Sequence, residues 1–173
     1  MKKFPRQIGV GCLEITGKEK RNVNEVLKSG RLSYGPFLQR FEKAFARAHD
    51  MRFAVMVNSG TSALEMALAC LKEVYKWKDG DEVLCPAVTF VASSNVIIAN
   101  NLTPVFVDVD PRTYNIDPSL IEAAITPKTR AIMVVHLFGQ PADMDAILAI
   151  AKKHQLKIIE DSCETMLVPY KDK

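Results

Sequence analysis

Polar residues suited to binding an anion lie directly before an almost wholly apolar segment. The run Asn58–Ser62 (N-S-G-T-S) precedes Ala63–Tyr75, whose apolar positions have helical periodicity. Gly60 permits a tight turn, and Thr61 and Ser62 place hydroxyl and backbone N–H groups at the start of the predicted helix. Unpaired amides and the helix dipole both favour a phosphate at such a point. The alternative is an ordinary Ser/Thr cap on a buried helix.

An aromatic and an acidic residue follow two other β-rich runs. Phe90 opens the helix predicted after a strand that ends near Pro86, so its ring could stack on a planar ligand or simply belong to the core. Asp161 follows the apolar run Leu156–Glu160, and a carboxylate at a strand end is either a ligand contact or a helix cap. His136 also ends a strand pattern, but a single histidine there usually belongs to hydrogen-bonded structure.

These groups together describe a site for a phosphorylated aromatic ring that can be protonated. Pyridoxal phosphate fits the description, because a carboxylate beside the pyridinium nitrogen lets the ring act as an electron sink. A nucleotide would also use the phosphate cradle. However, the sequence contains neither a G-x-G-x-x-G nor a G-x-x-x-x-G-K-[ST] motif to support one.

A parallel sheet would bring these groups together at one edge. From residue 51 onward, short β-rich runs alternate with helical patterns, which predicts an α/β fold with a mostly parallel sheet and helices on both faces. We expect one domain over residues 1–173, with a helical N-terminal segment (1–50) and an alternating β/α cofactor-binding part (51–173). The predicted strands are 53–57, 82–85, 104–109, 131–136 and 156–160, and the predicted helices are 16–29, one from Pro36, 63–75, 89–100, 119–125 and 144–154.

Composition and charge indicate which binding partners and which cellular compartment to expect. The net charge is +3 with the two signs interspersed, and no basic run or zinc-type Cys/His spacing occurs, so we expect neither nucleic acid nor metal. No segment is apolar and long enough to span a bilayer, and the N-terminus from Met1 to Pro5 lacks the apolar run of a signal peptide, so we expect a cytoplasmic protein. The widely spaced cysteines predict buried free thiols: Cys12, Cys70, Cys85 and Cys163.

An ordered set of motifs over nearly the whole chain from about Gly30 resembles the DegT/DnrJ/StrS family of sugar aminotransferases. The resemblance implies the large domain of the fold-type I transferases, pyridoxal 5'-phosphate as cofactor, and transfer of an amino group from glutamate to a keto-sugar nucleotide. It also implies a homodimer. The segments that carry it are the loop from Ser29 to Pro36, Asn58–Leu64, Gly80–Val83, Pro86–Ala92, Pro104–Asp110, Ile121–Thr126, His136–Asp145 and Ile159–Asp161.

The resemblance assigns roles to the same positions. Gly60, Thr61 and Ser62 would hold the cofactor phosphate, Phe90 would stack on the ring, and Asp161 would bind the ring nitrogen. The resemblance also assigns a role to the residue three positions after the aspartate, which would lie near the ring hydroxyl. It is usually Gln or His in the aminotransferases and is Glu164 here.

One expected residue is absent. The family's Schiff-base lysine lies farther downstream of Asp161 than Lys171 or Lys173, so we expect it beyond this sequence. We therefore interpret the chain as the N-terminal portion of the large domain, with an incomplete sheet and no activity by itself. Two alternatives stay open: a PLP- or PMP-dependent deoxysugar dehydratase of the same family, in which His replaces the lysine, and a non-catalytic binding or dimerisation fragment.

Overall fold

The structure, a computed structural model, describes residues 14–171 of the chain. Those residues divide into two compact units, one ending at Val55 and the other beginning at Met56. None of the helices within 14–171 is both long and apolar enough to cross a membrane.

The N-terminal unit consists of two helices whose starts were predicted from local signals. Thr16 caps α1 (Gly17–Ser29), and Glu19 completes a reciprocal capping box with it. Gly30 ends this helix with a left-handed backbone (φ 67°), a conformation that glycine adopts without steric cost. Pro36 occupies the first turn of α2 (Pro36–Ala48), where its missing N–H costs nothing.

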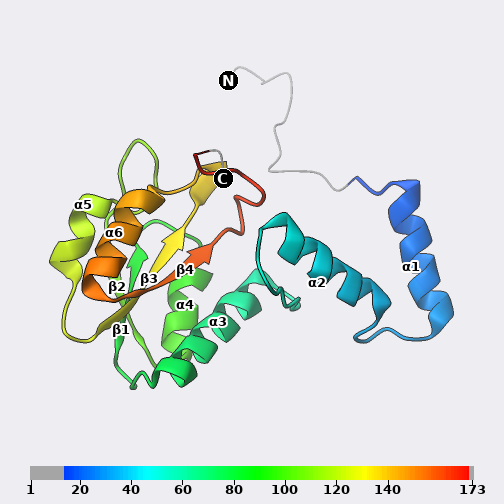
Figure 1. Ribbon diagram of the computed structural model, residues 1–173, viewed down its shortest axis with the longest axis horizontal. Coiled ribbons are helices and arrows are strands. Elements are labelled where there is room, and N and C mark those ends of the chain that lie inside the picture. The colour runs from blue at the N-terminus through cyan, green and yellow to red at the C-terminus, as the bar shows by residue number, and fades with distance from the viewer. Residues whose placement is uncertain (1–13, 172–173) are drawn as a thin grey trace, which may run out of the picture. The chain divides into compact units, whose positions relative to one another are not determined.

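The second unit is built on a parallel sheet of four strands in the order β2-β1-β3-β4 (Figure 1). This arrangement confirms the predicted α/β class. The strands are β1 (Glu82–Pro86), β2 (Thr103–Val107), β3 (Thr129–Val135) and β4 (Lys157–Asp161). The helices are α3 (Gly60–Tyr75), α4 (Ala92–Ala99), α5 (Pro118–Ile121) and α6 (Met144–His154), with short 3-10 turns η1 (Glu122–Ala124) and η2 (Leu137–Gly139).

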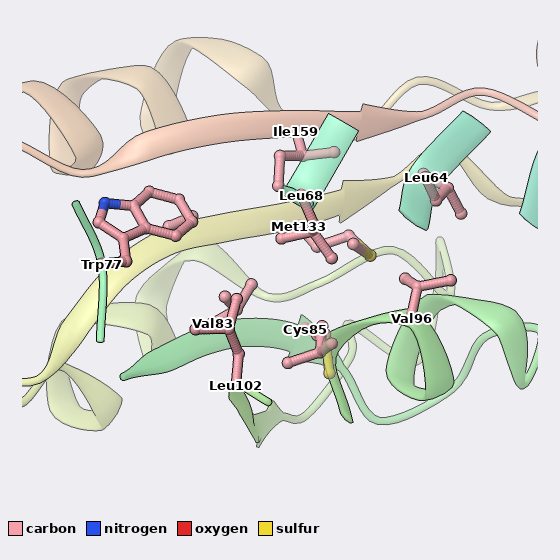
Figure 2. Close-up of a cluster of buried hydrophobic side chains, with 11 residues drawn as sticks. Leu64, Leu68, Trp77, Val83, Cys85, Val96, Leu102, Met133 and Ile159 are labelled. Atoms are coloured by element: carbon pink, nitrogen blue, oxygen red, sulfur yellow. The ribbon is translucent and has the colours of Figure 1, made fainter. Parts of the chain in front are cut away.

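Alternating side chains of the strands divide the core between the two faces of the sheet. Figure 2 shows the face on which Val83, Cys85, Met133 and Ile159 pack with residues of α3 and α4. The residues between them in sequence, such as Leu84, face α5 and α6 instead. The central strands are therefore apolar on both sides, as expected of a parallel sheet covered by helices. The second cluster includes Leu84, Ile132, Val134, Ile121, Met144 and Ile147.

Two predictions about secondary structure were wrong. Residues 53–57 form no strand, because no strand of the described chain pairs with them, and Phe53 and Val55 remain exposed. Helix α4 begins at Ala92 rather than near Thr89, so Phe90 lies in the loop that precedes it. Alternation of apolar residues is a local signal, whereas strand formation requires a partner elsewhere in the chain.

The cysteines also differ in part from the prediction. The three within the described residues are free thiols, as expected, but only Cys85 is buried. Cys70 and Cys163 are exposed, because Cys70 lies on the outer side of α3 and Cys163 lies in the loop after β4. Cys12 lies outside the described residues.

Helix α4 offers a matched test of the core, because it carries adjacent isoleucines in opposite environments. Ile97 is 0% exposed and Ile98 is 58% exposed. We expect Ile97→Ala to lower the free energy of unfolding by about 2–5 kcal/mol, through lost burial and the cavity left behind. Ile98→Ala should change it by no more than about 0.5 kcal/mol. Urea unfolding followed by circular dichroism measures both, and equal losses would contradict this packing of α4.

Candidate functional site

A pocket of about 200 Å³ lies where β1, β3 and β4 end at the same edge of the sheet. The register places Val135 of β3 beside Asp161 of β4, so the segments that follow these strands leave the sheet together. Ligands in open α/β sheets collect at this carboxyl edge. The pocket is lined by five residues that the sequence singled out: Gly60, Thr61, Phe90, Asp161 and Glu164.

Among the predicted site residues, Ser62 alone does not line the pocket. Its backbone amide is also already hydrogen-bonded. Ser59 is the N-cap of α3, and its Oγ accepts a hydrogen bond from the Ser62 amide at 3.1 Å. The amides of Gly60 and Thr61 have no acceptor within residues 14–171. The cap therefore lies one residue before the predicted turn, and two N–H groups at the start of α3 remain available to an anion.

Gly60 is required by a close contact rather than by a turn. A Cβ atom built at this position would lie 2.7 Å from Sγ of Cys163, well inside van der Waals distance. The absence of a side chain allows the start of α3 to approach the loop after β4. Although Cys163 as a residue is exposed, partial burial of its thiol raises the pKa to about 11, and the hydrogen bond and negative charge of Asp161 add to this effect. The thiol is therefore neutral at physiological pH.

Asp161 is 5% exposed and is held from two directions. The Ser93 hydroxyl donates to Oδ2 at 3.1 Å, and the backbone N–H of Cys163 donates to Oδ1 at 3.2 Å. No helix follows this residue within the described chain, which rules out a role as helix cap. Sequence reasoning missed Ser93, although a serine on the otherwise apolar buried side of a helix is a usable signal.

Phe90 does not belong to the core. Its side chain is 70% exposed, and it lines the pocket from the loop between β1 and α4. The core alternative for this residue was wrong. An exposed ring at the mouth of a pocket is available to stack on a planar ligand.

His136 is a structural residue, as its isolated position predicted. Its Nδ1 accepts the Ala142 amide at 3.0 Å, so the proton of the neutral ring is on Nε2, which lies 3.0 Å from the Glu160 carboxylate. This hydrogen bond lowers the pKa of Glu160 despite its partial burial. The backbone of His136 also donates to the carbonyl of Asp161 at 3.1 Å and accepts from Thr165 Oγ1 at 2.6 Å. The imidazole thus fixes the loop after β3 against the end of β4.

Glu164 lines the pocket from the loop after β4. Its Oε2 accepts the backbone N–H of Phe138 at 3.0 Å. This bond ties the loop after β4 to the 3-10 turn η2 and orients the carboxylate.

Comparison with known proteins agrees with this geometry. The family model of the DegT/DnrJ/EryC1/StrS aminotransferase family matches residues 13–173. The chain belongs to this family. Solved structures of similar proteins place the fold among the PLP-dependent fold-type I aminotransferases.

Curated relatives are similar over nearly all of the chain. The spore coat polysaccharide biosynthesis protein SpsC of Bacillus subtilis is 46% identical over 93% of the chain and 41% of its own length. The GDP-perosamine synthase of Caulobacter vibrioides is 42% identical over 100% of the chain and 46% of its own length. The chain thus spans less than half the length of these relatives.

A solved structure extends the comparison to a second activity. It is the Escherichia coli GDP-4-keto-6-deoxy-D-mannose-3-dehydratase with bound hydrated PLP, which is 31% identical with a TM-score of 0.89. The match covers 95% of this chain and 43% of the dehydratase.

The contact between Gly60 and Cys163 can be tested with one substitution that disturbs it and a second that should restore stability. We expect Gly60→Ala to lower the free energy of unfolding by about 1–3 kcal/mol, because the added methyl group overpacks the contact with Sγ. Adding Cys163→Ala should restore most of the loss, while Cys163→Ala alone should have a small effect. Urea unfolding of the three variants measures this coupling. A double variant no more stable than Gly60→Ala would show that another contact restricts position 60.

Proposed function

We propose that this chain is the cofactor-binding part of a PLP-dependent aminotransferase that acts on a keto-sugar nucleotide. The observation that carries the proposal is one pocket lined by two kinds of polar group. The start of α3 contributes backbone amides without an acceptor in the described chain, and the end of β4 contributes the buried Asp161 carboxylate. A ligand with an anionic group and a protonated ring nitrogen is complementary to both.

The phosphate end of the proposed site is formed by α3. The amides of Gly60 and Thr61 would donate to phosphate oxygens, with the hydroxyl groups of Thr61 and Ser62 beside them. The helix dipole favours a dianion at this point.

The ring end of the proposed site is formed by the segments after β1 and β4. Asp161 would pair with the ring nitrogen, and its hydrogen bonds to Ser93 and Cys163 fix the direction of the carboxylate. Phe90 would cover one face of the ring. When bound, pyridoxal phosphate supplies an electron sink that stabilises negative charge on the atoms attached to it.

Glu164 would stand near the ring hydroxyl. Two carboxylates beside one ring disfavour an ionised ring oxygen unless a proton is shared between the groups. The Phe138 amide holds Glu164 at 3.0 Å, in a position where it can accept such a proton. We therefore propose that Glu164 and the ring hydroxyl form one hydrogen-bonded pair.

Relatives guide the choice between transamination and dehydration. SpsC and the perosamine synthase are 46% and 42% identical to the chain, whereas the dehydratase structure is 31% identical. We propose a nucleotide sugar as acceptor, an amino acid such as glutamate as donor, and a homodimer as the working assembly. The dehydratase is the second candidate, supported by its TM-score of 0.89.

The whole protein, incubated with pyridoxal phosphate and reduced with borohydride, should retain a covalent adduct visible by mass spectrometry. A separate, unreduced sample loaded with pyridoxal phosphate should convert L-glutamate to 2-oxoglutarate in the presence of GDP-4-keto-6-deoxymannose or UDP-2-acetamido-2-deoxy-3-oxo-D-glucuronate, the sugars named for two relatives. Mass spectrometry of the sugar product distinguishes the candidates. A gain of nitrogen supports the aminotransferase, and loss of a hydroxyl without a retained nitrogen supports the dehydratase. Failure to form an adduct would contradict the aminotransferase, because the dehydratase has His in place of the lysine and a non-catalytic protein forms no imine. The sugar product then separates these two, since only the dehydratase changes the sugar.

Asp161→Asn should separate catalysis from cofactor retention. We expect turnover to fall at least about a hundredfold, because the amide cannot balance a positive charge on the ring nitrogen. Cofactor affinity should fall no more than about tenfold, because the contacts of the phosphate with α3 remain. Asp145→Asn on the surface of α6 is the matched control. The measurements are turnover and equilibrium dialysis of pyridoxal phosphate, and equal losses of both would contradict the assignment.

A further inference from the structure

Two exposed aromatic side chains meet beside the proposed cofactor site. The rings of Tyr114 and Phe138 lie 6.0 Å apart, centroid to centroid, at an interplanar angle of 70°. Their exposed fractions are 50% and 71%. Tyr114 lies in the loop after β2, and Phe138 lies in the turn η2 after β3. The edge-to-face contact orients both rings while leaving most of their surface open to solvent.

Both residues have left-handed backbones. The φ angles are 60° for Tyr114 and 55° for Phe138. This conformation is unfavourable for bulky side chains and is concentrated at binding sites and other functional positions. A glycine at either position would remove the strain, so the aromatic side chains are kept there against a local cost.

A buried asparagine locks the two loops together. Asn115 follows Tyr114 directly and is 3% exposed. Its Oδ1 accepts the Leu137 amide at 2.9 Å, and its Nδ2 donates to the Gln140 carbonyl at 3.0 Å. One side chain therefore holds both ends of the turn that carries Phe138. The two rings are consequently positioned as one rigid element.

This element adjoins the pocket. The backbone N–H of Phe138 is bonded to Glu164, and both Glu164 and Leu137 line the pocket. Phe138 is thus next to two residues that line the pocket, to Leu137 in sequence and to Glu164 through a hydrogen bond.

We propose that Tyr114 and Phe138 form an aromatic platform for the sugar ring of the substrate. The proposal rests on the proposed function. In a nucleotide sugar, the pyrophosphate separates the base from the sugar, so the part nearest the cofactor is the sugar that reacts. The axial C–H groups on one face of a pyranose form an apolar surface that packs on aromatic rings. Asn115 already fixes the backbone of the turn that carries Phe138, so binding would not have to order this turn.

The test compares sugar nucleotides with the nucleotides alone. Isothermal titration calorimetry on the whole protein loaded with pyridoxal phosphate would use GDP-mannose with GDP, and UDP-N-acetylglucosamine with UDP. For the pair that the wild type binds, Phe138→Gly should weaken the sugar nucleotide about tenfold and change the free nucleotide less than about twofold. Phe138→Tyr keeps the ring and should bind like the wild type.

Thermal unfolding separates binding from a purely structural role. Phe138→Gly should unfold at or above the wild-type temperature, because glycine accepts the left-handed backbone without strain. Lower stability with unchanged affinity would overturn the platform, and so would equal loss of affinity for both members of a pair. Either result leaves the proposed function standing. A wild-type protein that binds none of the four nucleotides would overturn the proposed substrate class, and the platform with it.

Discussion

The parallel register between β3 and β4 is the constraint on which the candidate site depends. Because Val135 pairs with Asp161, the carboxylate reaches the carboxyl edge just where the segment after β3 turns away. A slip of one residue would move Asp161 to the opposite face of the sheet and Ile159 out of its core cluster. Apolar packing on both faces of β3 thus fixes the position of a polar group at its edge.

Several unfavourable features of the second unit lie at or beside that edge. They include the buried Asp161 carboxylate, a helix start where a Cβ atom would clash with Sγ of Cys163, and two aromatic residues with left-handed backbones. Each costs free energy locally, and the two apolar clusters that cover the sheet offset these costs. Sequences depart from local preferences mainly where a site requires it. The carboxyl edge of the second unit follows this rule.

Local signals in the sequence predicted most of the elements. Asp117 with Pro118 marked the start of α5, and the helical pattern of residues 144–154 gave both ends of α6. The site was harder to predict, because its geometry depends on contacts between distant segments. Nothing near Gly60 in sequence reveals Cys163 as its neighbour, and nothing near Asn115 reveals the turn it holds. Pocket residues could be named from strand ends, but their hydrogen bonds could not.

The Asp161 carboxylate at the end of β4 also affects the side chain that lies against the start of α3. Asp161 accepts the backbone N–H of Cys163, and its charge, added to burial, helps to hold the Cys163 thiol in its neutral form. That thiol lies against the start of α3, where a negative charge would compete with an anionic ligand. The hydrogen bond and charge of Asp161 therefore reinforce a neutral thiol that partial burial already favours, next to a helix start that would bind an anion.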